Sequence, residues 1–160
     1  MRVVIQRVTH ASVTIEGKVK SAIGKGYLIL VGIGSDDTEE DAQWLIKKIV
    51  GLRVFDDEHG VMNLSIKDVG GDILIVSQFT LMASYKKGNR PSWIHAAPHN
   101  ISIPLYNRFV ELIKSFVIGQ VAVEVVLQIV DTGLGDSAHH EFHKFIVGSQ
   151  RHLNRHFRDK

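Results

Sequence analysis

The sequence predicts a mixed α/β fold, in a single compact domain with many strands and two main helices. Its 160 residues suit one domain that buries roughly two-thirds of the surface of the unfolded chain. Apolar stretches of strand length recur along the chain, and several are rich in β-branched side chains. Only two segments repeat apolar residues at helical spacing, so strands are expected to outnumber helices.

The first third of the chain is rich in predicted strands. Residues 3–8 and 11–15 alternate along their length, which is typical of strands with one buried face. Residues 19–23 lie between two glycine-containing turns and can complete a hairpin with the preceding strand. Residues 27–33 form a continuous apolar run, so we expect a strand that is buried on both faces.

A helix is expected to follow this strand. Residues 38–41, Thr-Glu-Glu-Asp, have the form of a capping box, with acids in the first turn where the helix dipole favours them. The apolar residues at helical spacing are Ala42, Leu45, Ile46, Ile49 and Val50. A helix start explains the acidic cluster better than a metal site does.

Shorter elements lead to a second apolar run. Residues 52–55 and 62–64 are predicted as short strands on either side of an acidic turn at residues 56–60. Gly70-Gly71 marks a turn, and Ile73–Val76 is apolar throughout, so we expect another buried strand there.

The second helix and a last strand follow. Ser102-Ile103-Pro104 predicts the start of the helix, because proline suits a first turn. Its expected buried side comprises Leu105, Phe109, Leu112, Ile113 and Phe116. Residues 121–130 are dominated by β-branched side chains and predict a strand.

The composition narrows the class of protein. The 44% apolar and 22% charged residues are ordinary for a soluble globular chain. The lack of cysteine excludes disulfides and thiolate metal sites and suits a reducing compartment. Neither a signal peptide nor a membrane-spanning run is apparent, so a cytoplasmic protein with no membrane contact is expected.

Charge is unevenly distributed along the chain. Residues 149–160 hold four basic side chains and one acidic side chain, so the basic character is concentrated there. We therefore expect a domain over residues 1–148 and a basic tail over residues 149–160. Such a tail suits a polyanionic partner, although solvated basic termini are common.

The polar end of the second buried strand is the first candidate site. Ser77, Gln78 and Thr80 follow Ile73–Val76, where a strand that only filled the core would continue with apolar residues. Backbone N–H groups that converge at such a sheet edge can stabilise an oxyanion in acyl transfer. Thr80 is a possible nucleophile, but no general base is adjacent in sequence. The alternative is a strand end that faces solvent.

A basic loop lies close to this candidate site in the sequence. Lys86, Lys87 and Arg90 occur within six residues of loop-type sequence. Three cations beside a polar pocket suit a phosphate-bearing substrate, since phosphate contacts position a nucleic acid without identifying its bases. The alternative is an ordinary solvated loop.

Histidines near the C-terminus are a weaker candidate. Five of the nine fall after residue 138, and two pairs, His139 with His143 and His152 with His156, stand four residues apart. The segment His140–His143 is one residue too short for the zinc-protease signature. We therefore expect no metal site, and a zinc-binding tail remains the alternative.

Several stretches together form one recognisable pattern: residues 4–8, 11–13, 62–63, 76–81, 87–92 and the helix containing Leu105-Tyr106. With this pattern the chain resembles the D-aminoacyl-tRNA deacylase family, also called the D-tyrosyl-tRNA deacylase family. The resemblance covers about residues 1–113 closely. The Ser77–Leu81 motif is highly specific when it occurs together with these other stretches.

The resemblance implies a fold of layered sheets and helices that works as a homodimer without a cofactor. Enzymes of this family hydrolyse the ester of an aminoacyl-tRNA. They release a D-amino acid, or glycine mischarged onto tRNA for alanine, from the terminal adenosine. The motif would line the pocket for that adenosine and the ester.

The resemblance also implies roles for individual residues. The catalytic residues would be Ser77, Gln78, Phe79 and Thr80. The substrate-binding residues would be Leu81, Arg7, Lys86, Lys87 and Arg90. The family is usually described as using backbone N–H groups and the hydroxyl of the RNA, so substrate-assisted hydrolysis is expected rather than covalent catalysis by Thr80.

One family motif is altered in this chain. The family carries Asn-x-Gly-Pro-x-Thr with a cis proline, which enters the partner subunit's pocket and excludes L-amino acids. Here Gly133 matches, but Leu134 replaces the proline. A cis bond costs about 2.5–4 kcal/mol before a residue other than proline, against about 0.5–1 before proline, so a trans bond is expected.

The altered motif leaves a second function open. With Gly133-Leu134 the chain is either an active deacylase or a catalytically impaired, nucleic-acid-binding relative. The resemblance ends past Gly135, and either a shifted reading frame near residues 114–120 or true divergence accounts for the change.

Overall fold

Two apolar strands form the centre of the fold. In this computed structural model, β4 (Gly26–Gly32) pairs in parallel with β7 (Asp72–Ser77). β1 (Arg2–Val8) lies antiparallel to β4, and β8 (Val121–Glu124) lies parallel to β7, giving the order β1-β4-β7-β8. The structure describes residues 1–15, 17–86, 88–124 and 144–148.

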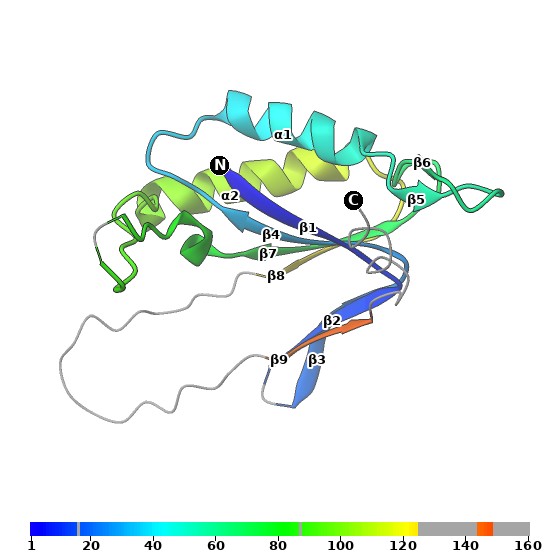
Figure 1. Ribbon diagram of the computed structural model, residues 1–160, viewed down its shortest axis with the longest axis horizontal. Helices are drawn as coiled ribbons and strands as arrows, with labels where there is room; N and C mark the ends of the chain where they lie inside the picture. The colour runs from blue at the N-terminus through cyan, green and yellow to red at the C-terminus, as the bar shows by residue number, and fades with distance from the viewer. Residues whose placement is uncertain (16, 87, 125–143, 149–160) are drawn as a thin grey trace.

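Two helices cover one face of this sheet (Figure 1). They are α1 (Glu39–Gly51) and α2 (His99–Lys114). Alternate residues of the central strands point toward the helices, and the buried ones are Tyr27, Ile29, Val31, Ile73 and Ile75. Each fully buried side chain of this size contributes about 1.5–3 kcal/mol to folding, so this interface is a major source of stability.

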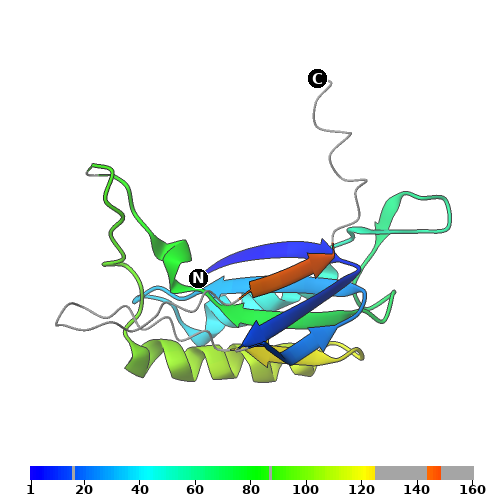
Figure 2. The same cartoon turned by 90° about the horizontal axis from the view of Figure 1, so that it is seen from below.

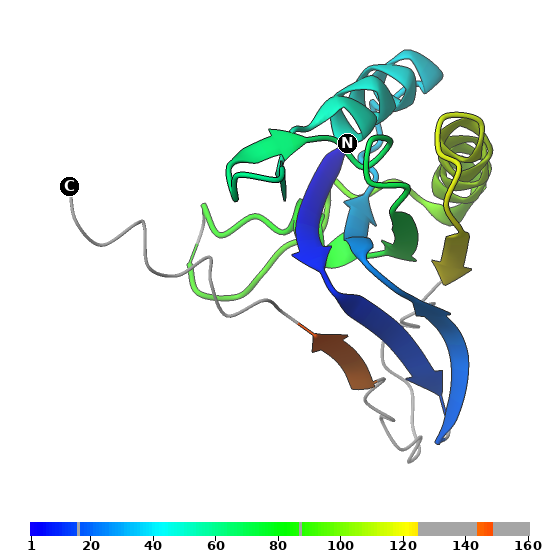
Figure 3. The ribbon, with the colours of Figure 1, turned by 90° about the vertical axis from the view of Figure 1, so that its right-hand side faces the viewer.

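A second sheet covers the opposite face, which gives three layers (Figure 3). Its order is β3 (Lys18–Ile23), β2 (His10–Ile15) and β9 (Lys144–Gly148). Apolar residues of the hairpin β2–β3 pack against Leu28, Leu74 and Val76, the intervening residues of the central strands. Strands buried on both faces therefore appear in the sequence as the continuous apolar runs described above.

The predicted start of α1 is confirmed. The backbone N–H of Thr38 donates to Oδ2 of Asp41 at 2.8 Å, and the Thr38 hydroxyl donates to the same oxygen at 3.0 Å. These hydrogen bonds, the backbone one foremost, hold the pKa of Asp41 below its ordinary value. Glu39 accepts from Nε of Arg108 at 2.9 Å and so joins the two helices.

The predicted start of α2 is wrong. The helix begins at His99, and Pro104 lies inside it rather than in its first turn. Proline is tolerated there because Pro104 and Asn100, whose carbonyl loses its intrahelical donor, are both exposed. Phe116, which was expected on the buried side, is 37% exposed beyond the end of the helix.

The predicted strand at residues 52–55 is also displaced. β5 comprises only Phe55–Asp56 and pairs with β6 (Met62–Leu64). The preceding carbonyls bond to side chains instead of a partner strand, since Leu52 accepts from the Tyr27 hydroxyl and Val54 accepts from Arg7.

None of the helices in the described ranges is long and apolar enough to cross a membrane.

Candidate functional site

The candidate site begins where β7 ends, at an edge of the central sheet (Figure 1). Ser77 is the last residue of β7 and lies opposite Val31 of β4. The backbone N–H of Gln78 donates to the Val31 carbonyl at 2.7 Å, which continues the ladder one residue beyond the strand. The polar sequence after the apolar run is therefore a strand end, as predicted.

A single 3-10 turn, η1 (Phe79–Met82), follows at once. The N–H of Leu81 donates to the Gln78 carbonyl at 3.2 Å, and the N–H of Ala83 donates to the Thr80 carbonyl at 3.1 Å. The side-chain amide of Gln78 donates to Oγ1 of Thr80. The five motif residues, Ser77 to Leu81, are all half-buried, so they line a surface that a ligand can reach.

Two residues that the sequence did not single out hold η1 against the sheet. A Cβ built on Gly32 would lie 2.9 Å from Cβ of Leu81 and 3.0 Å from the Gln78 carbonyl oxygen, so only glycine allows this approach. Nη1 of Arg2 donates to the Leu81 carbonyl at 2.8 Å. Their contacts span 46 or more positions along the chain, and no local pattern could indicate them.

An aromatic contact links the motif to the segment that follows the basic loop. The rings of Phe79 and Trp93 meet edge to face, with centroids 5.9 Å apart. Nε1 of Trp93 is buried and has no hydrogen-bond acceptor among the residues that the structure describes. Trp93 was not predicted as a site residue, because a lone tryptophan after a loop carries no specific signal.

The basic loop lies beside the motif in space as well as in sequence. Ser84 and Ser92 exchange two backbone hydrogen bonds of 2.8 and 3.0 Å, which close the loop at its base. Lys86 and Arg90 are exposed. Lys87 lies outside the described residues.

Arg7 lies at the opposite end of the sheet from the motif. In the β1–β4 register Arg7 faces Tyr27, whereas Arg2 faces Gly32 beside the motif. These two positions of β1 are about 17 Å apart along the strand. Within one chain, the structure therefore does not bring Arg7 together with Ser77.

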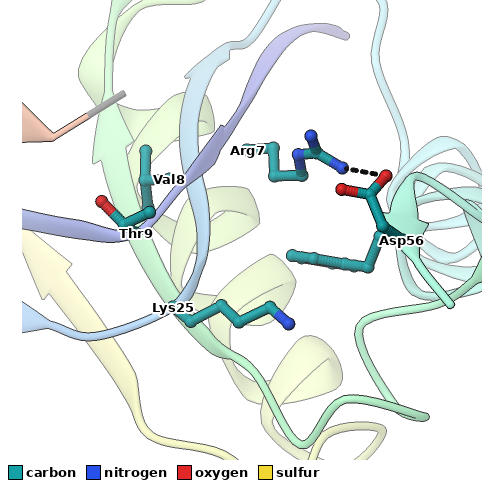
Figure 4. Close-up of a pocket in the computed structure, with 6 residues that line it drawn as sticks. Arg7, Val8, Thr9, Lys25 and Asp56 are labelled. Carbon is teal, nitrogen blue, oxygen red and sulfur yellow. Dashed lines mark hydrogen bonds and ion pairs between the residues drawn. The ribbon is translucent and has the colours of Figure 1, made fainter. Parts of the chain in front are cut away.

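Arg7 instead lines a small open hollow together with Lys25 and Asp56 (Figure 4). Its Nη1 donates to the Val54 carbonyl at 2.5 Å and to Oδ1 of Asp56 at 3.1 Å. Burial raises the pKa of the neighbouring Tyr27 to about 12, and the charge of Arg7 opposes this shift.

Other predicted site residues fall outside the described ranges. These are Gly133, Leu134 and the paired histidines of the C-terminal segment. In the remainder of the chain, no three histidine or carboxylate side chains are grouped so that they could hold a metal ion.

Comparison with known proteins identifies related sequences. A family model described as D-Tyr-tRNA(Tyr) deacylase matches residues 4–133. A D-aminoacyl-tRNA deacylase from Phocaeicola vulgatus is 72% identical over 109 residues, which cover 68% of this chain and 73% of that protein. One from Thermotoga petrophila is 54% identical over 114 residues, which cover 71% and 76%.

Two solved structures resemble the whole fold. A protein described as c-Myc DNA Unwinding Element Binding Protein superposes with a TM-score of 0.77 and 34% identity, covering 94% of this chain and 93% of its own. A probable eukaryotic D-amino acid tRNA deacylase gives a TM-score of 0.68 over 92% and 93% of the two chains, and at 14% identity it supports the fold alone.

Proposed function

The chain belongs to the D-Tyr-tRNA(Tyr) deacylase family, and we propose from this premise that it hydrolyses D-aminoacyl-tRNA to a free D-amino acid and tRNA. The observation that carries the proposal is the Ser77–Leu81 motif, placed at the end of a central strand and inside the matched residues 4–133. The relative from Phocaeicola vulgatus, named as such a deacylase, adds support at 72% identity. Glycine mischarged onto tRNA for alanine is a second proposed substrate.

The proposed reaction needs no covalent enzyme intermediate. The oxygen of a water molecule bonds to the ester carbonyl carbon, and the bond from that carbon to the ribose oxygen breaks. The ribose oxygen then takes up the proton that the water loses. The hydroxyl of the RNA assists this transfer, and backbone N–H groups of the motif stabilise the oxyanion of the tetrahedral intermediate.

Features of η1 support this mechanism. Phe79 and Thr80 are its first two residues, and the first N–H groups of a helical turn have no acceptor within it. The Thr80 hydroxyl accepts from the Gln78 amide, and in the described part of the chain no histidine or carboxylate hydrogen-bonds to it. A threonine without such a base is a weak nucleophile at neutral pH.

We propose a cytoplasmic homodimer as the working form, binding tRNA and needing no cofactor. A dimer would let a partner subunit complete the pocket. Arg7 is distant from the motif in its own chain, so a dimer would also allow it to contribute at the contact with the other subunit. Sedimentation equilibrium tests this part, and a monomer at working concentration contradicts it.

The decisive experiment compares D-tyrosyl-tRNA with L-tyrosyl-tRNA as substrates for the full chain. We expect release of D-tyrosine, and the ratio of the D rate to the L rate measures how much chiral rejection survives the replacement of proline by Leu134, each tenfold corresponding to about 1.4 kcal/mol of discrimination. Binding of uncharged tRNA without hydrolysis of either ester would overturn the proposal and identify an impaired, RNA-binding relative. Equal hydrolysis of both would point to loss of chiral rejection through Leu134.

A further inference from the structure

An exposed tyrosine stands in the basic loop and has no role in the site described so far. The Tyr85 side chain is 63% exposed, and no hydrogen bond or ring contact is made by it within the described ranges. A large aromatic ring that is exposed to solvent adds little to the free energy of unfolding. Single exposed rings are common on protein surfaces, so the surroundings of Tyr85 decide whether it can bind a ligand.

The surroundings of Tyr85 are positively charged. Lys86 and Arg90 are exposed in the same loop, and no acidic residue occurs between Ser84 and Ser92. An aromatic ring with uncompensated cations on the same loop is the combination that binds unpaired nucleotides, because bases stack on the ring while phosphates pair with the cations.

The loop is joined to the motif at both of its ends. Its first end continues from η1 through the hydrogen bond between the Ala83 N–H and the Thr80 carbonyl. Its second end returns through Ser92 to Trp93, whose ring contacts Phe79. Figure 2 shows this green segment standing away from the helices and sheets, so the loop is exposed beside the motif.

We propose that Tyr85 stacks on an unpaired base of the single-stranded 3′ end of the RNA substrate, while Lys86 and Arg90 contact adjacent phosphates. This proposal rests on the proposed function, because it assumes an RNA whose 3′ terminus lies at the motif. It goes further by assigning a base-stacking role to a residue outside the motif. It also predicts that affinity depends on the unpaired nucleotides and not only on the duplex.

The test uses the full chain and two uncharged hairpin RNAs with the same stem, one with a four-nucleotide 3′ tail and one blunt. Fluorescence anisotropy measures both affinities for wild type, Tyr85→Phe and Tyr85→Ala. Since a stacked base typically contributes a factor of about 5 to 150, we expect Tyr85→Ala to weaken binding of the tailed RNA about tenfold. Binding of the blunt RNA should change less than about twofold, and Tyr85→Phe should behave as wild type.

A matched control is available on α1. Trp44 is 60% exposed and lies near Lys48, so Trp44→Ala removes another exposed ring with a basic neighbour, far along the chain from the motif. It should leave both affinities unchanged. Equal losses on both RNAs with Tyr85→Ala, or no loss on either, would overturn the stacking proposal, as would binding of an acidic peptide that depends on Tyr85 while RNA binding does not.

Failure of this proposal differs from failure of the proposed function. Tail-dependent binding that is lost in Tyr85→Ala, in a chain that hydrolyses no D-aminoacyl-tRNA, supports stacking and refutes the deacylase. Normal hydrolysis with the same KM and the same tail affinity in Tyr85→Ala refutes stacking and leaves the deacylase intact.

Discussion

At the scale of single residues, the Thr80 hydroxyl separates two mechanisms. The side chain of Gln78 donates to this hydroxyl, which positions it but does not remove its proton. The backbone N–H of Thr80, the second residue of η1, suits an oxyanion. One residue therefore offers two groups, and only a substitution that removes one of them can assign the chemistry.

Thr80→Val makes this separation, because it keeps the branched shape and the backbone N–H. With backbone-assisted hydrolysis we expect kcat/KM on D-tyrosyl-tRNA within about tenfold of wild type, and a stability loss of about 1 kcal/mol for the unpaired amide. A Thr80 nucleophile requires a loss of about a thousandfold or more. Thr80→Ser, which keeps the hydroxyl, is the control.

At the scale of elements, α1 depends on its first turn. Asp41 accepts two hydrogen bonds from Thr38, and the pKa of its carboxyl is held below the ordinary value. A carboxylate with a lowered folded-state pKa stabilises the fold fully above the unfolded-state value. It loses that contribution as the pH falls through the folded-state value.

Asp41→Ala is therefore expected to lower Tm by a few degrees at pH 7, since the cap loses its acceptor. The difference from wild type should begin to shrink as the pH falls below about 4, where the carboxyl becomes protonated in the unfolded state, and should disappear once the carboxyl is protonated in the folded state as well. Thermal unfolding monitored by circular dichroism from pH 7 to pH 3 measures this. Glu40→Ala, which removes a neighbouring first-turn carboxylate with no hydrogen bond in the described part of the chain, should lower Tm less than Asp41→Ala does.

At the scale of the whole molecule, the site is assembled from segments far apart in sequence. Gly32 of β4 and Leu81 of η1 pack more closely than any larger residue allows. The side chain of Arg2 of β1 holds the same turn by donating to the Leu81 carbonyl. The position of the motif therefore depends on the three-layered packing that places these strand ends together.

Gly32→Ala should test this dependence. Its Cβ would meet Leu81 and the Gln78 carbonyl at 2.9 and 3.0 Å, so the turn must move. We expect a stability loss of about 1–3 kcal/mol in urea unfolding and a fall in kcat/KM of more than about tenfold. Gly51→Ala, with no atom within 4 Å of the new Cβ, should change neither. Full activity of Gly32→Ala would contradict the role of close packing.

The sequence predicted what local patterns determine. Continuous apolar runs indicated β4 and β7, and a capping sequence with apolar periodicity indicated α1. It failed at Pro104, where a residue suited to a helix start lies inside the helix. Gly32, Arg2 and Trp93 were missed because their importance comes from tertiary contacts, which no local window of sequence contains.

The contact between Trp93 and Phe79 also gives the protein an optical property. The chain contains two tryptophans, of which Trp44 is 60% exposed and Trp93 has a buried indole nitrogen against the motif. Replacing Trp44 with phenylalanine would leave one tryptophan, in contact with the proposed catalytic turn. Its emission wavelength would then report occupancy of the pocket directly, without any attached label.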